Sequence, residues 1–539
     1  MIKISQLKLS VSHGERELEE KIRKLLHLNK EEKFTYEVAK KSIDARKKED
    51  LQYVYQIILT CKNEKTILKK IKNKDIQAFQ RDDFIYYQVR EEIEVERPLV
   101  VGSGPAGLFC AYYLAKAGLR PVILERGEGC DKRKEDVEDF WKTNILNENS
   151  NVQFGEGGAG TFSDGKLNTL VKDPKGRNRE VLKILVEAGA PAHILYDSKP
   201  HLGTDILIKI LKNIRKKIES YGGNYYFQSK VTDLLIKDKK ICGLIVNGEK
   251  EFRASSVVLA IGHSARDTFD WLSKKGILME SKSFAVGFRI EHPQNMINIS
   301  QYGENFPKEL GAAPYKLTHQ SSNQRGVYSF CMCPGGYVVN ASSEKGRLAV
   351  NGMSYSQRDS ANANSAIIVS VGDEDFKLAQ DKETPKVLWG MNFQRCLEKK
   401  AFLLGGGKIP LQCLGDFIEN RESRSFGDFL PCIKGDYQFA NLRELLPGEL
   451  NQSLMEAMSA FEKKIKGFSR KDAIFSGVES RTSSPVRILR DESMQSNISG
   501  LYPCGEGAGY AGGITSAAMD GLKVAEAIVL KISSGSVLS

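Results

Sequence analysis

Apolar residues recur with strand-like or helix-like periods through the first ninety residues of the chain. Apolar and polar positions alternate over 2–11, as in a half-buried strand. Over 16–26 the apolar positions Leu18, Ile22 and Leu26 fall on one face of a helix. The pattern predicts, in order, a strand at 2–11, a helix at 16–26, strands at 34–44 and 51–61, a helix near 64–72 and a strand at 84–89.

This order of elements, β-α-β-β-α-β, is that of the ferredoxin-like split βαβ motif. The charged, proline-containing segment EEIEVERP at 91–98 follows it, and a buried-looking strand, LVVG, begins at residue 99. A charged linker before a new apolar strand is typical of a domain boundary. We therefore predict an N-terminal ferredoxin-like α+β domain at 1–97.

A strand, a glycine-rich turn, a helix and a second strand ending in an acid follow at 98–126, PLVVGSGPAGLFCAYYLAKAGLRPVILER. In a dinucleotide site Gly102 would allow the tight turn, Gly104 the approach of a pyrophosphate, and Gly107 close packing of the helix on the sheet. Glu125 stands where a carboxylate accepts ribose hydroxyls, which argues against a 2′-phosphate. A glycine turn that binds nothing is the alternative. The expected contacts are Gly102, Ser103, Gly104, Pro105, Ala106, Gly107, Glu125 and Arg126.

A second glycine-rich segment, SGLYPCGEGAGYAGGITSAAMDGLKVAEAI, lies near the end of the chain at 499–528. Its strand ends at Glu506 and its helix begins near Gly513, so a helix N-terminus could face the electron-rich edge of a flavin. A simple nicotinamide dehydrogenase needs no second cradle of this kind, which favours FAD over NAD. The further expected contacts are Gly158, Val231, Gly262, Gly505, Glu506, Gly513, Ile514 and Thr515.

Between the two cradles, segments such as VGFRIEHP, GVYSFCMCPGGYVVNA and GRLAVNGMSYS predict antiparallel strands. The predicted fold class is α/β, with a three-layer ββα Rossmann-type FAD-binding domain at 98–281 and 431–539. A mainly antiparallel β substrate or cap domain would be inserted at 282–430. The glycine runs at 334–336 and 405–407 do not follow buried strands, so we interpret them as turns rather than as a second nucleotide site.

These motifs resemble those of the glutathione-reductase-type FAD superfamily, in its class with a single dinucleotide site. More closely, QFGEGGAGTFSDGKL at 153–167, ESRTSSPVRILRDE at 479–492 and LYPCGEGAGYAGGITSAAMDG at 501–521 resemble a family of uncharacterised bacterial FAD-dependent oxidoreductases, often labelled NAD(FAD)-utilising dehydrogenases. The resemblance covers nearly the whole chain and implies an FAD-binding fold without naming a substrate. Related flavoproteins usually carry Asp where this chain has Glu506.

Two segments carry side chains suited to the reaction. The loop at 153–167 is too glycine-rich for regular structure and offers Ser163, Asp164 and Lys166. Lys166 could stabilise negative charge on a reduced flavin or a substrate, with Asp164 positioning it; a loop salt bridge is the alternative. Arg481, with Arg487 two turns later, could bind a carboxylate or phosphate, the cofactor pyrophosphate included. No residues are predicted to bind a metal.

Composition excludes several classes of protein. With 41% apolar and 27% charged residues, 539 residues indicate a globular chain of two or three domains. No apolar run reaches the ~18 residues of a membrane span and no secretory segment opens the sequence, so we expect a cytoplasmic location. Ten cysteines without framework spacing suggest reduced thiols, and the pair Cys331 and Cys333 lacks the second ligand pair of a zinc site. The net charge is +11, and the basic residues are intermixed with acidic ones along most of the chain, which favours solvated faces over one phosphate-binding patch.

The resulting prediction is an FAD-dependent oxidoreductase that moves a hydride between flavin and a small or lipid-like organic substrate. Without a second dinucleotide fingerprint, electrons would come from the substrate, from transiently docked NAD(P)H or from a protein partner. The alternative is an FAD-containing RNA-modifying or nucleic-acid-binding protein, which the ferredoxin-like domain and positive charge would suit. Tyr53 and Tyr55 are aromatic but lack the sequence of an RNA-recognition strand, so nucleic acid is the less favoured partner. A non-catalytic FAD-stabilised scaffold is a third possibility.

Overall fold

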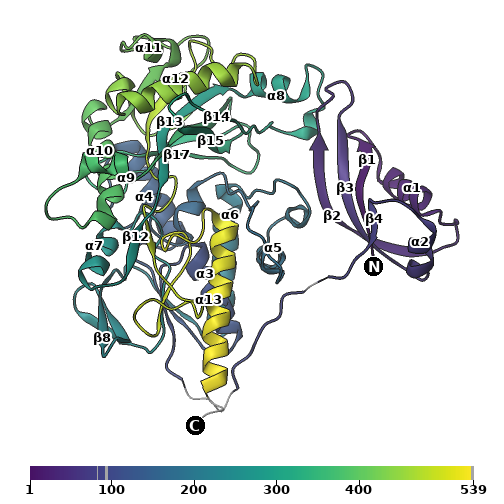
Figure 1. The fold of residues 1–539 in the computed structure, drawn as a ribbon, viewed down its shortest axis with the longest axis horizontal. Helices are drawn as coiled ribbons and strands as arrows, with labels where there is room; N and C mark the ends of the chain where they lie inside the picture. The colour runs from purple at the N-terminus through teal and green to yellow at the C-terminus, as the bar shows by residue number, and fades with distance from the viewer. Residues whose placement is uncertain (82, 91–94, 536–539) are drawn as a thin grey trace.

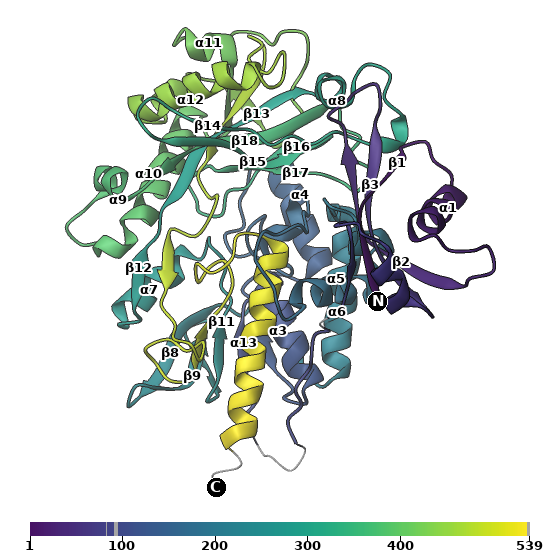
Figure 2. The same cartoon turned by 45° about the vertical axis from the view of Figure 1, so that its right-hand side comes forward.

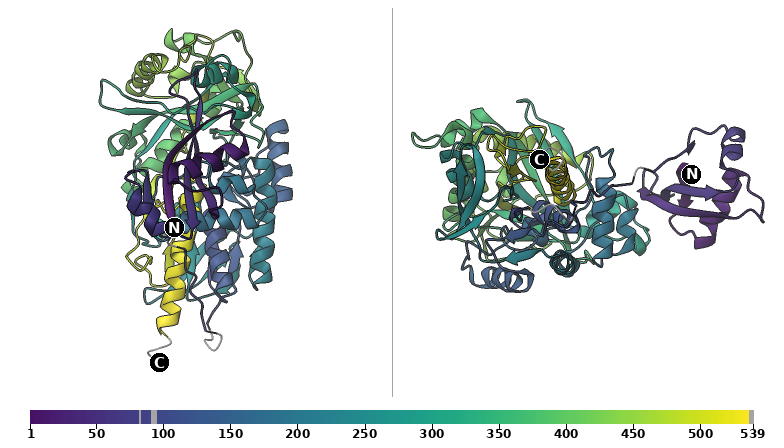
Figure 3. Two further views of the ribbon diagram at one scale, coloured as in Figure 1. Left: turned by 90° about the vertical axis from the view of Figure 1, so that its right-hand side faces the viewer. Right: turned by 90° about the horizontal axis from the view of Figure 1, so that it is seen from below.

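The computed structural model describes residues 1–81, 83–90 and 95–535. Figure 1 shows a two-layered body, with a parallel sheet and its helices below and a larger antiparallel sheet with α10, α11 and α12 above. A small N-terminal unit stands to one side of this body, which Figure 3 shows from two further directions. Residues 91–94 of the predicted linker lie outside the described residues.

The N-terminal unit is one antiparallel sheet with two helices. Its strand order is β2-β3-β1-β4, and its elements follow the β-α-β-β-α-β order of the split βαβ motif. Alternate residues of β1 and β3, including Ile2 and Leu59, are fully buried against Ile22 of α1. The elements are β1 (Ile2–Ser10), α1 (Glu15–Leu26), β2 (Phe34–Asp44), β3 (Gln52–Cys61), α2 (Glu64–Lys70) and β4 (Ile76–Ala78).

The strand predicted at 84–89 is wrong, because the fourth strand is formed by β4 instead. The aromatic residues that suggested a strand pack on α3 of the main body. Phe84 and Tyr86 make edge-to-face ring contacts with Tyr113, and the backbone N–H of Tyr87 donates to the Tyr113 hydroxyl at 2.9 Å. The apolar pattern of this segment therefore records burial against a helix rather than a place in a sheet.

The lower half of the body is built on a five-stranded parallel sheet of order β24-β11-β5-β6-β7. Its strands are short, and the three central ones, β11, β5 and β6, are wholly apolar, as in sheets buried on both faces. Helices α3, α5, α6 and α13 share a core on one face, and the antiparallel sheet β10-β9-β8 covers the other (Figure 2). The elements are β5 (Leu99–Val101), α3 (Pro105–Lys116), β6 (Val122–Leu124), α4 (Cys130–Thr143), α5 (Arg177–Glu187), α6 (Thr204–Ser220), β7 (Asn224–Tyr226), β8 (Val231–Lys237), β9 (Lys240–Val246), β10 (Lys250–Arg253), β11 (Val257–Leu259), α7 (Arg266–Lys274), β24 (Leu501–Pro503) and α13 (Ile514–Gly535).

The upper half is a seven-stranded, mainly antiparallel sheet of order β14-β15-β18-β13-β22-β19-β21. Because β21, β22 and α12 belong to its core, the boundary predicted at residue 430 falls inside this unit, which continues to Glu479. The elements are β13 (Phe284–Pro293), α8 (Gln294–Tyr302), β14 (Thr318–Gln320), β15 (Gly326–Cys333), β16 (Tyr337–Asn340), β17 (Val350–Met353), β18 (Asn362–Val371), α9 (Asp373–Phe376), α10 (Trp389–Leu404), β19 (Ile409–Cys413), α11 (Leu414–Ile418), β20 (Ile433–Lys434), β21 (Tyr437–Phe439), α12 (Gly448–Glu462) and β22 (Ile474–Glu479). A separate two-stranded sheet, β12 (Met279–Ser281) with β23 (Val486–Ile488), packs on the core of the lower half.

Short 3₁₀ helices complete the chain at η1 (Gly158–Phe162), η2 (Ala192–Leu195), η3 (Lys308–Leu310), η4 (Lys377–Ala379), η5 (Lys386–Leu388) and η6 (Leu442–Glu444). The predicted turns at 334–336 and 405–407 are both turns in the structure. Among the described residues, no helix combines the length and apolarity that a membrane crossing requires.

The N-terminal unit is joined to the lower half through β2. Lys41 donates its backbone N–H to the carbonyl oxygen of Tyr196 at 2.7 Å and accepts from Ser198 at 2.8 Å. Glu37 of the same strand forms ion pairs with Arg81 and with Arg179 of α5. Backbone pairing and charge thus hold the small sheet beside the segment that leads into α6.

A buried ion cluster joins the two halves of the body. Glu398 of α10 accepts from Arg266 of α7 at 2.6 Å and from Arg481, just after β22, at 2.7 Å. All three side chains are at most 8% exposed. Burial alone would raise the pKa of Glu398, but the two guanidinium groups hold it well below the usual range.

We predict that Glu398→Gln lowers the free energy of unfolding by about 3–5 kcal/mol, because it leaves buried Arg481 without its counter-charge and Arg266 with Glu344 alone. Urea unfolding followed by tryptophan fluorescence measures the change. Glu374→Gln is the matched control, since Glu374 is exposed and pairs only with exposed Lys377, and it should cost less than about 1 kcal/mol. Equal unfolding curves for Glu398→Gln and the wild type would contradict a structural role for the cluster.

Candidate functional site

A cavity of about 330 Å³ lies between the two halves of the body, where the N-termini of α3 and α13 come together. Six stretches of the lower half line it. They are the glycine turn before α3, the end of β6, the loop at 153–168, residues 229–231 at the start of β8, the turn after β11, and the C-terminal cradle. Phe330, Cys331, Asn351, Glu479, Arg481 and Thr482 close it from the upper half.

The glycine turn before α3 is shaped by contacts that exclude side chains. Gly102 has φ +95° and a Cβ there would collide with the carbonyl oxygen of Ala260, while a Cβ on Gly107 would collide with that of Gly102. Gly104 differs, since a Cβ would meet only Gly158 at an ordinary 3.7 Å. Gly102 and Gly107 therefore serve the fold, and Gly104 leaves room over the helix N-terminus.

The C-terminal cradle is anchored from below. The N–H of Gly505 donates to Asp520 at 2.7 Å, and the Thr515 hydroxyl donates to the carbonyl oxygen of Leu167 at 2.7 Å. A Cβ on Gly512 or Gly513 would meet no atom within 4 Å, so the backbone before α13 faces open space. The first turn of α13 thus presents free N–H groups to the cavity.

The sequence-predicted cofactor residues fall into two groups. Those that line the cavity are Gly102, Gly104, Pro105, Ala106, Glu125, Arg126, Gly158, Val231, Gly262, Glu506, Gly513 and Ile514. Ser103, Gly107, Gly505 and Thr515 do not line it and support the turns beneath. The predicted reaction residues Ser163, Asp164, Lys166 and Arg481 all line the cavity.

Glu125 is held by the protein itself. One carboxylate oxygen accepts from the backbone N–H and the hydroxyl of Ser103, and the other accepts from the N–H groups of Gly127 and Gly155, all within 3.1 Å. A carboxylate has about four acceptor positions, so few remain for ribose hydroxyls. Glu125 organises the turns around it. Arg126 beside it pairs with Asp267 at 2.7 Å.

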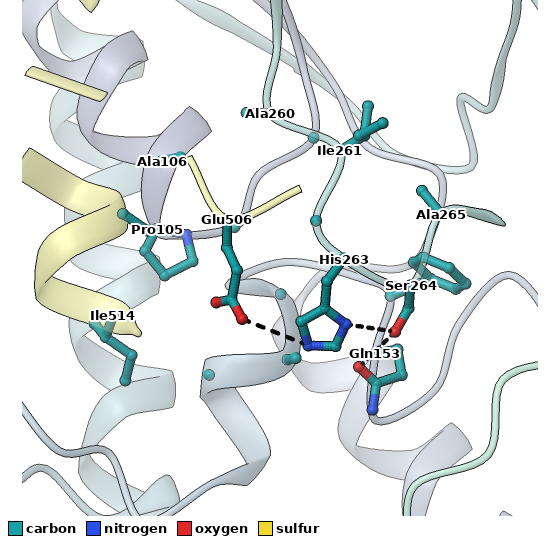
Figure 4. Close-up of a pocket in the computed structure, with 18 of the residues that line it drawn as sticks. Pro105, Ala106, Gln153, Ala260, Ile261, His263, Ser264, Ala265, Glu506 and Ile514 are labelled. Carbon is teal, nitrogen blue, oxygen red and sulfur yellow. Dashed lines mark hydrogen bonds and ion pairs between the residues drawn. The ribbon is translucent and has the colours of Figure 1, made fainter. Parts of the chain in front are cut away.

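A chain of polar groups leads from Glu506 into the loop at 153–168 (Figure 4). Ser264 donates to Gln153 at 3.0 Å, so the Nδ1 of His263, 2.9 Å from the same hydroxyl, acts as its donor. Nε2 of His263 then faces Glu506 at 4.0 Å as an acceptor. Burial, with Arg481 and Arg266 nearby, lowers the pKa of His263 to about 3. Burial raises the pKa of Glu506 to about 7, against the opposing effect of Lys282.

The loop residues Ser163, Asp164 and Lys166 have distinct partners. Ser163 donates to the carbonyl oxygen of Gly160 at 2.7 Å, which closes η1. Asp164 is fully buried and bound by Arg358, and Lys166 lies 3.5 Å from it. The Lys166 ammonium donates to the carbonyl oxygen of Met332, so it bridges the loop and β15 while remaining one-third exposed.

Arg481 is engaged in the buried cluster. It binds Glu398 through two nitrogens and also donates to Ser343 and Ser264, so its guanidinium is committed to the protein. Arg487, the expected companion, lies on β23 and pairs with Glu280 at 3.1 Å. The two arginines are not brought together as an anion site.

Sequence reasoning missed several cavity residues. Glu479 pairs with Arg289 at 2.9 Å, and burial raises its pKa to about 7 despite that arginine. The motif ESRTSSP contains Glu479, but the prediction from this motif used only its arginine. Cys331 belongs to a segment predicted as an antiparallel strand, whereas it lines the cavity at a break in β15.

Comparisons with known proteins give both whole-chain and partial matches. Residues 283–482 match the family FAD-dependent protein, C-terminal domain-like; residues 100–130 match an NAD(P)-binding Rossmann-like domain, and residues 1–60 a domain of unknown function. A protein of Clostridium beijerinckii described as uncharacterized is 51% identical over 537 residues, 98% of this chain and 99% of that protein.

Two proteins of Pyrococcus horikoshii are more distant. Thiamine thiazole synthase is 27% identical over 195 residues, covering 34% of this chain and 62% of the synthase. The crystal structure of L-proline dehydrogenase aligns with 81% of this chain and 94% of its own, at 14% identity and a TM-score of 0.34.

The raised pKa of Glu506 predicts how the stability of the cofactor-free protein changes with pH. Glu506 binds its proton up to about pH 7 when folded, against a reference pKa of 4.5. The contribution of Glu506 to the free energy of unfolding is therefore complete below pH 4.5, and it is lost as the pH rises through 7. Glu506→Gln should be more stable than the wild type at pH 8 by on the order of 2–3 kcal/mol, and equal to it near the reference pKa.

Denaturant unfolding across this pH range measures the difference. Glu135→Gln, which replaces an exposed carboxyl on α4, is the control and should follow the wild type throughout. Parallel loss of stability in Glu506→Gln and the wild type would refute the assignment.

Proposed function

Because the chain belongs to the same family as the Clostridium beijerinckii protein and carries the C-terminal domain of an FAD-dependent protein family, we propose that it binds FAD in the cavity and is an oxidoreductase. Bound FAD supplies the chemistry of accepting or donating a hydride. The observation that carries the proposal is the meeting of two glycine-rich helix N-termini, before α3 and α13, at one cavity.

The residues present fit the two ends of FAD. The α3 turn with Gly104 would hold the pyrophosphate, because helix N-terminal N–H groups bind phosphate oxygens. Gly512 and Gly513 leave open space before α13, where the flavin ring would receive N–H groups at its electron-rich edge. Ser229 and Val231 line the end of the cavity assigned to the adenosine. The carboxyl group of Glu506 is protonated below about pH 7, so it would donate a hydrogen bond to the ribityl and phosphate region of FAD rather than repel it.

At the other end of the cavity, Lys166 carries the charge best placed for chemistry. It is one-third exposed and faces the cavity from a loop pinned to β15. An ammonium there stabilises negative charge on the reacting groups. An organic substrate would enter between this loop and the upper sheet.

Within the described residues, the remaining glycine runs are turns rather than a strand, turn and helix, which supports electron supply by the substrate, by transiently docked NAD(P)H or by a protein partner. The nucleic-acid alternative gains no support, since Tyr55 is buried in the N-terminal core and bonded to His13. Stacking on bases needs exposed rings.

A visible absorption spectrum of the purified protein, followed by anaerobic additions of NADH and then NADPH, tests this function. We expect bound flavin, bleached by one of the two nucleotides. Flavin that neither nucleotide reduces would assign electron supply to the organic substrate or to a protein partner, and a protein that binds no added FAD would overturn the proposal.

Gly104→Val should weaken FAD binding by at least roughly tenfold, because its side chain would fill the space above the α3 N-terminus. The fold tolerates it, since Gly104 has φ −67° and its Cβ would make only an ordinary contact. Gly448→Val, at the start of α12, also meets open space but lies away from the cavity. This control should bind FAD as the wild type does; equal binding by both variants would place the cofactor elsewhere.

Lys166→Met should lower the reduction potential of bound flavin by on the order of 30 mV, because a nearby cation stabilises the reduced, anionic form. Equilibration with a reference dye during anaerobic reduction measures it. Lys172→Met, at an exposed position six residues later, should leave the potential unchanged. An unaltered potential in Lys166→Met would remove Lys166 from the flavin's surroundings.

A further inference from the structure

The CxC pair of β15 lies at a break in the upper sheet. The pairing of β15 with β18 shifts register between Phe330 and Cys333, so Cys331 falls out of the ladder. Cys331 has φ +43°, a left-handed conformation that a residue with a side chain adopts at a cost. This bulge brings the pair together: the Cys333 thiol donates to the carbonyl oxygen of Cys331 at 3.2 Å.

Two cations hold the bulge in this conformation. Arg289 donates to the carbonyl oxygen of Cys331 at 2.9 Å, and Lys166 donates to that of Met332. Both carbonyl groups are therefore satisfied although the ladder is broken. Arg289 is fully buried and is itself fixed by Glu479, so the support is rigid.

The pair has one accessible thiol and one sheltered thiol. Cys331 lines the cavity proposed to hold the flavin, whereas Cys333 is fully buried behind it. The hydrogen bond from Cys333, together with Lys166 and Arg289, lowers the pKa of Cys331 against the effect of burial. A thiol of lowered pKa at the cavity wall, with a second thiol two residues later bonded to its own carbonyl oxygen, is an arrangement suited to thiol–disulfide chemistry.

We propose that Cys331 and Cys333 form a redox-active dithiol that exchanges an electron pair with FAD in the cavity. The inference rests on the proposed function, because FAD is the oxidant. As the S–S bond forms, both S–H bonds break; two electrons and one proton pass to oxidised FAD, and the second proton passes to solvent. The reverse transfer opens the disulfide and restores two thiols.

A structural role for the thiols explains less. Buried cysteines that only fill space need neither a left-handed backbone nor two cations on successive carbonyl groups. A metal site is not favoured, since no group of three metal-ligating side chains gathers within the described part of the chain.

The test counts electrons and maps thiols on the same FAD-loaded protein. Air-oxidised protein is titrated anaerobically with dithionite, and samples are denatured, alkylated and digested with trypsin. Peptide 326–345 contains both cysteines of the pair and no other. We expect an uptake of four electrons per bound flavin instead of two. Before reduction the peptide should be unalkylated and lighter by two hydrogen masses, and afterwards it should carry two alkyl groups.

Cys331→Ser and Cys333→Ser should each take up only two electrons per flavin, whereas Cys396→Ser, at an exposed position on α10, should retain four. An uptake of two electrons by the wild type, with peptide 326–345 alkylated twice before reduction, would overturn the dithiol and leave the flavin assignment intact. Absence of bound flavin would overturn both. If the serine variants do not fold, the electron count and peptide mass of the wild type still decide.

Discussion

The close approach of α3 and α13 is the contact on which the rest of the site depends. A Cβ on Gly521 of α13 would collide with the carbonyl oxygen of Ala106, and one on Gly505 would collide with the Ala106 side chain. Only glycine allows the two helices to come this near. Because they pack so closely, their N-termini open onto one cavity although more than four hundred residues separate them in sequence.

Buried charge keeps the upper half of the body in place over that cavity. Arg266, Glu398 and Arg481 come from three distant segments, and Glu398 joins the other two. Arg289 with Glu479 forms a second buried pair, between the neighbouring strands β13 and β22 of the upper sheet. Networks of this kind are costly to disrupt because each remaining charge would be buried without a partner. The first cluster ties α10 and the segment after β22 to α7 of the lower half.

The sequence predicted those parts of the structure that depend on local pattern. The glycine turn, both cradles and the antiparallel character of the upper sheet follow from short motifs and periodicity, and most predicted cofactor residues do line the cavity. The errors involve long-range contacts. The segment at 84–89 has the alternation of a strand, but its aromatic rings pack against Tyr113 of α3 instead of joining a sheet. The boundary at 430 failed because β22 returns to pair with β13.

The same limit explains the misjudged side chains. Arg481 looked free for a ligand because Glu398, its partner, lies 83 residues earlier in the chain. Cys331 looked like an ordinary strand residue because the bulge depends on Arg289 and Lys166, which no local motif connects to it. A sequence motif identifies which residues are chemically able to act. Whether such a residue is free to bind a ligand depends on partners that only the folded chain brings next to it.

Three glutamates line a cavity proposed to bind an anionic dinucleotide, and two effects keep them from repelling it. Both carboxylate oxygens of Glu125 already accept hydrogen bonds from Ser103, Gly127 and Gly155. Burial raises the pKa of Glu479 to about 7 against the opposing effect of Arg289, and burial likewise raises that of Glu506 to about 7. With these carboxyls neutralised or occupied, the helix N-termini and Lys166 dominate the field in the cavity. The three carboxyl groups therefore contribute hydrogen bonds and shape to the cavity, while backbone N–H groups would bind the negative charge of the phosphates.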